Sequence, residues 1–212
     1  MGTMNVETCT TDIRQVASAK LPTKWGSFRI LGFEREVSSE HGPRLETAVA
    51  LIMGDLYAAP PLLRIHSQCF TGDVLGSVRC DCQAQLELAM KIISREGAGI
   101  VIYEMQEGRG IGLMAKLQAY ALQDEGLDTV EANQHLGLAV DTRDYLLPVE
   151  ILKELGIGKV RLLSNNPDKY AALVNADIDV VERVPCEVQP DPHAKSYLLT
   201  KKIKLGHLLA LV

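Results

Sequence analysis

Residues 145–182 decide the fold and read YLLPVEILKELGIGKVRLLSNNPDKYAALVNADIDVVE. Apolar residues have helical spacing in Tyr145–Leu155 and again in Asp168–Asn175. The segments that follow these helices, Val160–Leu163 and Asp179–Glu182, are short, apolar and of strand length. Alternation of helix and strand is typical of layered α/β domains with parallel neighbouring strands. This stretch therefore predicts an α/β fold with parallel pairing in the second half of the chain.

The first half is richer in strand-like segments, for which we expect antiparallel pairing. The expected strands are Gly26–Phe33, Glu46–Met53, Leu62–Ser67 and Ile100–Tyr103, and the further expected helices are Gln83–Arg95, Leu113–Asp124 and Thr200–Leu211. We find neither an internal repeat nor a linker, so we expect one layered domain over residues 19–212, with a mixed β-sheet flanked by helices. A polar N-terminal arm, residues 1–18, is expected to precede it.

Composition and charge limit the classes of protein that the chain can belong to. It has 212 residues, 47% of them hydrophobic and 23% charged, which is a globular balance. The 22 Lys and Arg residues are outnumbered by 27 Asp and Glu residues. Because nucleic-acid-binding proteins usually carry a basic excess, we expect no nucleic acid partner, and any phosphate site is a local pocket. No segment has the apolar length of a membrane span or of a signal peptide, so a cytoplasmic protein without membrane contact is expected.

Three of the five cysteines form the strongest local signal of chemistry. Cys69 is followed eleven residues later by Cys80, and one residue separates Cys80 from Cys82. This crowding is a poor disulfide framework and is more typical of a metal or catalytic site. Thiolates favour zinc, which prefers four ligands. From the residues alone, His66 could complete a structural site, the fourth position could stay open for a water of low pKa, or the cysteines could bind no metal.

A glycine-rich turn after the strand Ile100–Tyr103 is a candidate anion site. Glycines within Gln106–Gly112 let backbone N–H groups approach an anion, and Arg109 could form a forked pair with a phosphate. The turn matches no known nucleotide motif, so an ordinary tight turn is the alternative.

A second candidate anion site follows the strand Val160–Leu163. Asn166 is expected to cap a helix that begins at Pro167. Ser164 and Lys169 would then lie near the positive end of that helix. A capped helix with a solvated lysine is the alternative.

Taken together, these motifs resemble those of the GTP cyclohydrolase II family. In chain order they are Arg64-Ile-His-Ser-Gln-Cys-Phe-Thr-Gly-Asp73, Arg79-Cys-Asp-Cys82, Gln106-Glu-Gly-Arg-Gly-Ile-Gly-Leu113, Asp141-Thr-Arg143 and Asn165-Asn-Pro167. The resemblance runs from about Ala19 to Leu209, which is nearly the whole chain. It implies an enzyme that opens GTP at the start of riboflavin synthesis, releasing formate and pyrophosphate and leaving a diaminopyrimidinone ribosyl phosphate.

The resemblance also implies the parts of the site. Zinc would be held by Cys69, Cys80 and Cys82, its open position would hold the attacking water, and magnesium would accompany the triphosphate. Asp141 matches the proton acceptor, Arg143 the nucleophile and Tyr120 a catalytic tyrosine. The positions that match GTP-binding residues are Arg64, Ile65, His66, Ser67, Gln68, Gln85, Glu107, Gly108, Arg109, Thr129, Ser164 and Lys169. Family members are typically homodimers, so a homodimer is implied.

Physical chemistry adds expectations about individual roles. Arg109 and Lys169 are expected to hold phosphates, and Glu107 and Gln85 to read the edge of the guanine ring. Because an arginine is a poor nucleophile while it is protonated, two roles stay open for Arg143. It could form a covalent guanylyl intermediate, or it could only stabilise charge at the α-phosphate while water attacks.

Three positions depart from the family's usual pattern. Gln68 stands where Glu is usual, Ser164 where Thr is usual, and Gln83 where Gly is usual. Gln68 removes a negative charge beside Cys69, so the rate, the substrate preference or completion of the second hydrolysis could differ.

Two other functions compete with the full reaction. One is a related GTP hydrolase that stops at a formamide intermediate, and the other is a zinc-stapled nucleotide-binding or regulatory protein without turnover. The ratio of formate to pyrophosphate distinguishes the first. Chelation distinguishes the second, because loss of a structural zinc unfolds its domain.

Overall fold

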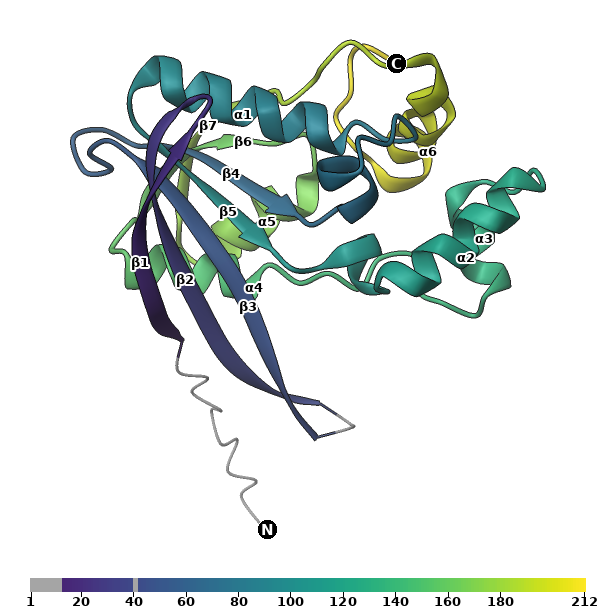
Figure 1. The fold of residues 1–212 in the computed structure, drawn as a ribbon, viewed down its shortest axis with the longest axis horizontal. Coiled ribbons are helices and arrows are strands. Elements are labelled where there is room, and N and C mark those ends of the chain that lie inside the picture. Colours follow the sequence, from purple (N-terminus) through teal and green to yellow (C-terminus); the bar gives the residue numbers. More distant parts are fainter. Residues whose placement is uncertain (1–12, 40–41) are drawn as a thin grey trace.

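The computed structural model describes residues 13–39 and 42–212, and its strands form one mixed sheet (Figure 1). The seven strands are β1 (Arg14–Thr23), β2 (Gly26–Ser39), β3 (Gly42–Met53), β4 (Leu62–Ser67), β5 (Gly99–Glu104), β6 (Lys159–Leu163) and β7 (Asp179–Val184). Their order across the sheet is β1-β2-β3-β5-β4-β6-β7. Pairing is antiparallel from β1 to β5 and parallel from β5 to β7. The expectation of antiparallel pairing in the first half is therefore wrong for β4 and β5, which pair in parallel. The predicted α/β class with a mixed sheet is confirmed.

Helices cover both faces of this sheet. On one face lies α1 (Cys82–Glu96), and on the other lie α4 (Leu146–Glu154) and α5 (Pro167–Asn175). Helices α2 (Leu113–Asp124), α3 (Thr129–His135) and α6 (Lys195–Leu205) lie beyond the sheet (Figure 1). Side chains of β5 alternate between the two layers, as a strand requires. Val101 packs with Ile93 of α1 on one face, whereas Ile100 and Ile102 pack in the cluster that contains Ile151 of α4 on the other. Among the described residues, no helix has both the length and the apolar character needed to cross a bilayer.

The topology creates a ligand crevice at the carboxyl end of β4. This strand has β5 on one side and β6 on the other. The chain reaches β5 through α1 on one face and enters β6 from α4 on the opposite face. In open α/β sheets, ligands bind outside the carboxyl ends of strands at such a switch point. The motifs follow directly here, with Cys69 after β4, Arg109 after β5 and Ser164 after β6.

The sheet begins earlier in the chain than the sequence predicted. Strand β1 begins at Arg14 and pairs along β2, so residues 14–18 belong to the sheet and not to an arm. The reason is that β1 has mostly exposed side chains and therefore lacks the apolar alternation that identifies a strand. The remainder of the expected arm, residues 1–12, lies outside the described residues.

Two helices also differ from expectation. Helix α3 was not predicted; it begins with a capping box in which the Asp128 side chain accepts from the backbone and Glu131 reaches back. The C-terminal helix was expected over Thr200–Leu211, but it begins at Lys195 and ends before Gly206, whose φ of 64° forms a left-handed cap.

Candidate active site

A cleft of about 360 Å³ opens at the carboxyl ends of β4, β5 and β6. Two of the residues named from the sequence do not line it. Ile65 is buried below the cleft, where its carbonyl accepts from Lys169 Nζ at 2.8 Å, and Asp141 lies behind Arg143 at a second cavity. The named residues that do line it are Arg64, His66, Ser67, Gln68, Cys69, Cys80, Cys82, Gln85, Glu107, Gly108, Arg109, Tyr120, Thr129, Arg143, Ser164 and Lys169.

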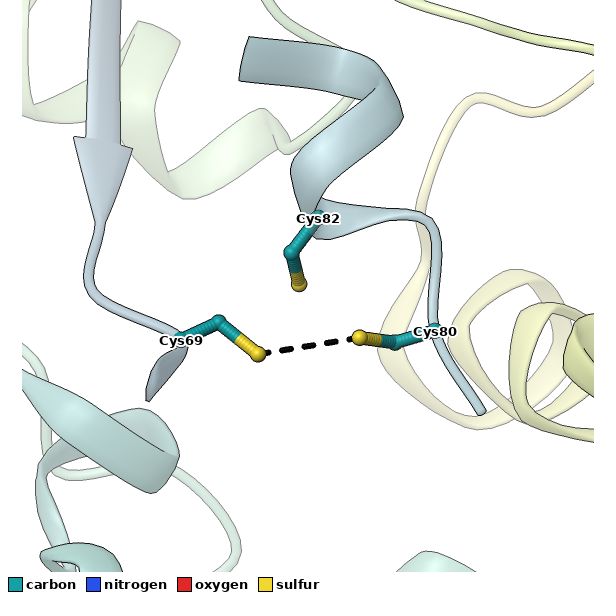
Figure 2. Close-up of side chains that lie close together, drawn as sticks. All are labelled: Cys69, Cys80 and Cys82. Carbon is teal, nitrogen blue, oxygen red and sulfur yellow. Dashed lines mark hydrogen bonds between the residues drawn. The ribbon is translucent and has the colours of Figure 1, made fainter. Parts of the chain in front are cut away.

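The three cysteine side chains converge on one point (Figure 2). Cys69 follows β4, Cys80 lies in the next loop and Cys82 is the first residue of α1. Their sulfur atoms all lie within 4.8 Å of one another, and those of Cys69 and Cys80 are 3.6 Å apart. Thiolates bound to one tetrahedral zinc at about 2.3 Å would be separated by about 3.8 Å. The arrangement therefore fits a single zinc ion.

A glycine makes room for this convergence. A Cβ atom on Gly72 would lie 3.1 Å from the sulfur atoms of both Cys69 and Cys80. Only a residue without a side chain leaves the thiols this close to the backbone. The loop between the first two cysteines is thus shaped around the candidate metal position.

His66 has a different role from the fourth ligand that the sequence left open. Its Nε2 lies 3.1 Å from Asp73 Oδ2, and its ring stacks on Tyr103 with the centroids 5.3 Å apart. Asp73 also accepts from the Tyr103 hydroxyl at 2.8 Å and from the Cys69 backbone N–H at 3.0 Å. Burial lowers the pKa of His66. In the described part of the chain, the metal group consists of the three thiols without this histidine.

A lysine from α2 compensates the charge of the thiol cluster. Lys116 Nζ donates to Cys69 Sγ at 3.1 Å and to Glu107 Oε1 at 2.8 Å. Hydrogen bonds from Cys80 and Cys82, together with Lys116, hold the pKa of Cys69 well below its usual range. The hydrogen bond to Cys69 raises the pKa of Cys80 to about 11, and that of Cys82 is also raised. Because a thiol must lose its proton to bind a metal, metal binding at this cluster would release protons.

Arg109 gives the clearest sign of an anionic ligand. Both of its terminal nitrogens are buried, and neither has a hydrogen-bond partner among the described residues. Its φ of 61° is left-handed, which is unusual for a residue other than glycine. Buried donors without partners and local backbone strain both concentrate at binding sites. The guanidinium is consequently positioned to receive an anion in the cleft.

Further cations surround the same space, although the chain has a net charge of −5. Lys169 is only 4% exposed, and burial and the charge of Arg64 lower its pKa well below the usual value. Burial and the nearby Lys201 and Arg143 lower the pKa of His207 to about 3. A concentration of positive charge that disfavours further protonation attracts a polyanion such as a triphosphate.

The helix cap predicted after β6 is confirmed. The Asn166 side chain accepts from the Asp168 backbone N–H at 2.9 Å, and Pro167 is the first residue of α5. Ser164 Oγ accepts from the Asn166 backbone N–H at 3.1 Å. This local network brings Ser164 and Lys169 to the cleft.

Arg143 is held rigidly by Asp141. Its Nε and NH2 atoms donate to the two Asp141 carboxylate oxygens at 2.9 and 2.5 Å, and its NH1 donates to Ser67 Oγ at 3.3 Å. Although burial acts against it, the paired carboxylate raises the pKa of Arg143 above its ordinary value. Arg143 correspondingly lowers the pKa of Asp141 despite its burial. The pair therefore remains charged at neutral pH, which favours charge stabilisation over nucleophilic attack by Arg143.

Other named residues occupy the walls of the cleft. Tyr120 on α2 has its hydroxyl 3.3 Å from Thr71 Oγ1, and burial raises its pKa. Gln85 on α1 accepts from Arg64 NH2 at 2.7 Å through its amide oxygen. Thr129 is the first residue of α3.

Several residues of the site were not predicted from the sequence. Lys116, Tyr197 and Lys201 line the cleft, Glu104 accepts from Ser67 Oγ at 2.5 Å, and Asp81 lies between two metal-ligand candidates. The lysines and the tyrosine lie in amphipathic helices, where no spacing distinguishes them from solvated residues. Glu104 offered one signal, because it is a carboxylate at the end of a buried strand directly before the glycine-rich turn.

A contact between two motifs yields a testable prediction. The Thr142 backbone N–H and hydroxyl both donate to the Arg109 carbonyl, at 3.0 and 3.2 Å, and a Cβ on Gly110 would overlap Thr142 Oγ1. We expect Gly110→Ala to lower kcat/KM at least about tenfold, because it separates Arg109 from the segment that carries Arg143.

The control for Gly110→Ala is Gly112→Ala. Gly110 and Gly112 have similar φ values of 89° and 85°, but a Cβ on Gly112 meets no atom within 4 Å. Both variants should lose about 1–3 kcal/mol of folding free energy to backbone strain, because Gly112, with a ψ of 167°, also occupies a region that only glycine adopts readily. Equal kinetic losses in the two variants would refute the importance of the contact.

The family profile and the relatives that match this chain carry the same description. The chain matches the family profile described as GTP cyclohydrolase II over residues 14–185. It is 52% identical to the GTP cyclohydrolase-2 of Citrobacter koseri over 198 residues, which cover 93% of this chain and 98% of that protein. The GTP cyclohydrolase-2 of Escherichia coli O9:H4 has the same identity and coverage. A solved two-domain 3,4-dihydroxy-2-butanone 4-phosphate synthase from A. baumannii aligns with a TM-score of only 0.39 and 16% identity, over 73% of this chain and 34% of that one.

Proposed function

The chain belongs to the GTP cyclohydrolase II family, and we propose that it is a zinc-dependent enzyme that opens the imidazole ring of GTP. In this proposal it releases formate and pyrophosphate and forms a diaminopyrimidinone ribosyl phosphate, the first step of riboflavin biosynthesis. One observation carries the proposal: three converging thiols share a cleft with a group of buried cations. A metal alone would suit many hydrolases, whereas the combination suits a purine triphosphate.

The thiols would hold the metal and keep one side of it accessible. Cys69, Cys80 and Cys82 fit zinc, and no other described His, Cys, Asp or Glu joins their group. Zinc bound in this way supplies a Lewis acid and a water of low pKa for hydrolysis. Tyr120 lies on the wall of the same cleft, with its hydroxyl positioned by Thr71. We assign it a catalytic role on that basis.

Arg109 and Lys169 are the proposed phosphate ligands, with Mg²⁺ accompanying the triphosphate. The buried guanidinium nitrogens without partners support Arg109, and the near-complete burial of an amine beside Arg64 supports Lys169. A buried cation is unfavourable without an anion, so the bound phosphate would relieve this cost.

Glu107 and Gln85 are the proposed readers of the guanine edge. Glu107 already accepts from the Phe70 backbone N–H at 2.6 Å and from Lys116, but each carboxylate oxygen has more than one lone pair. These contacts fix the carboxylate in the cleft wall, which makes it a rigid acceptor. Gln85 is fixed in the same way by Arg64.

Replacement of Lys169 tests the phosphate assignment. We expect Lys169→Ala to raise KM for GTP about tenfold or more, because one charged contact to phosphate is lost, a change of about 1.4 kcal/mol or more. Because the pKa of Lys169 is lowered, the affinity for GTP should also depend on pH. An anion raises that pKa again, so GTP binding should take up protons, and affinity should fall as pH rises through the pKa of the free site.

Calorimetry in buffers of different ionisation enthalpy measures this proton uptake. The uptake should be smaller in Lys169→Ala than in the unmodified protein. The exposed Lys159, at the start of β6, provides a matched control, and Lys159→Ala should leave both KM and the uptake unchanged. An unchanged KM in Lys169→Ala would remove this residue from the site.

Incubation of the zinc- and magnesium-loaded protein with GTP tests the whole proposal. The full reaction yields formate and pyrophosphate in equal amounts together with a pyrimidine chromophore. A hydrolase that stops at the formamide would give pyrophosphate without equal formate, and a non-catalytic protein would give neither. Gln68 lines the cleft beside Cys69, so Gln68→Glu shows whether this departure limits the second hydrolysis.

Family membership also supports a homodimeric, cytoplasmic enzyme as part of the proposal. Light scattering of the purified protein at micromolar concentration measures its mass, and a monomer at that concentration would contradict the dimer.

A further inference from the structure

The C-terminal helix α6 forms one wall of the cleft, although it lies beyond the region that matches the family profile. That match ends at residue 185, and α6 begins at Lys195. Figure 1 shows α6 next to the loop that leads into α1. Tyr197 and Lys201 project from α6 into the lining of the cleft. The helix is therefore placed to influence the site directly.

Lys201 pairs with the residue between two of the candidate metal ligands. Its Nζ donates to Asp81 Oδ1 at 3.1 Å, and Asp81 separates Cys80 from Cys82. The exposed fractions of the two side chains are only 11% for Lys201 and 7% for Asp81. The Lys201 ammonium also lies 4.5 Å from the centroid of the Tyr197 ring. This is a buried ion pair, for which loss of one partner is costly.

The Asp81 carboxylate also connects the loop that carries Cys80 to Arg64 of β4. Asp81 accepts a second hydrogen bond from the Gln85 side-chain amide, and Gln85 in turn accepts from Arg64 NH2 at 2.7 Å. Arg64 NH1 donates to the Leu163 carbonyl at 3.2 Å. An unbroken series of polar contacts thus runs from α6, past two thiols, to Arg64 within β4 and to the end of β6.

Charge balance explains why a lysine lies at position 201. Three thiolates on a divalent cation leave a net negative group, and the Asp81 carboxylate adds a further negative charge. Lys116 lies against Cys69 on one side of this group, and Lys201 offsets the charge on the side of Cys80 and Cys82. Without Lys201, a buried carboxylate would stand unneutralised between two thiolates and would repel them.

We propose that Lys201 is a positioning residue for the zinc site: it holds Asp81, and through Asp81 it sets the Cys80 and Cys82 thiols and the Gln85–Arg64 pair. This inference rests on the proposed zinc-dependent function. Partners that orient metal ligands typically change metal affinity 10- to 100-fold when they are removed.

Zinc affinity measured by competition with a chromophoric chelator tests this role. We expect Lys201→Met to weaken zinc binding about tenfold and to lower kcat/KM for GTP. Lys202→Met, on the exposed side of the same helix, is the matched control and should change neither quantity. Lys201→Arg keeps the charge and should restore most of the zinc affinity.

A double-mutant cycle separates positioning from a merely structural role. If Lys201 acts through Asp81, Lys201→Met should cost no further zinc affinity in an Asp81→Asn background. A Lys201→Met protein with a lower melting temperature but unchanged zinc affinity would overturn the inference. If Lys201→Met does not fold, Asp81→Asn and Lys201→Arg carry the test, and wild-type zinc affinity in Asp81→Asn would overturn it. If the unmodified protein binds no zinc, the proposed function itself fails.

Discussion

Replacing Cys82 with serine is expected to abolish zinc binding and to lower kcat/KM for GTP at least about 1000-fold, or about 4 kcal/mol. Cys82 begins α1, and its sulfur lies within 4.8 Å of those of Cys69 and Cys80. A serine hydroxyl does not ionise near neutral pH, so the site would retain two thiolates and a poor third ligand. Loss of the metal removes the group that would activate water, which is why a very large effect is expected.

Cys186 provides the control for this experiment. It is also buried and reduced, but it lies outside the metal group, and burial raises the pKa of its thiol. Cys186→Ala should therefore retain zinc, as measured by elemental analysis, and most of the activity. Circular dichroism should show that Cys82→Ser keeps the fold, because both faces of the sheet have extensive cores. Full zinc content in Cys82→Ser, or unfolding on chelation of the unmodified protein, would contradict a catalytic metal.

Most of the fold could be predicted because its central elements bury apolar side chains in regular patterns. Strands β4 and β5 are almost wholly buried and β6 is buried at three of its five residues, so their short apolar segments stand out in the sequence. Strand β1 has no such pattern because its side chains are largely exposed and its order comes from hydrogen bonds to β2. Helix α3 has only seven residues, so two turns of periodicity were too few to identify it.

Residues of the candidate site could be predicted where they lie in contiguous sequence motifs. The motifs at Cys69, Arg109 and Ser164 each follow a strand of the parallel part of the sheet, so the topology brings them together, whereas Asp141–Arg143 lies between α3 and α4. Contacts between residues that are far apart in the sequence could not be predicted, because they leave no pattern in it. Lys116 lies 47 residues from Cys69, and Lys201 lies 120 residues from Asp81. Such pairs are set by how helices pack around the cleft, which periodicity does not specify.

Arg143→Ala is expected to lower the rate of pyrophosphate release about 100- to 1000-fold, the usual effect of removing a preorganised charge-stabilising donor. Arg143→Lys should retain more activity, because the positive charge remains while the two-point pairing with Asp141 is lost. Arg161→Ala is the control, since that arginine pairs with Glu96 and Glu182 on the surface.

A trapping experiment decides between the two roles left open for Arg143. Attack by its guanidinium requires loss of a proton, but pairing with Asp141 raises the pKa of Arg143 and lowers that of the carboxylate that would accept the proton. Both shifts act against a covalent guanylyl intermediate and favour charge stabilisation at the α-phosphate. We therefore expect intact mass spectrometry of the Cys82→Ser variant, which keeps Arg143 and Asp141 but lacks the metal proposed to open the ring, to show unmodified protein when it is quenched during incubation with GTP. A guanylyl adduct that maps to Arg143 would instead establish covalent catalysis, and the ion pair would then have to break before each attack.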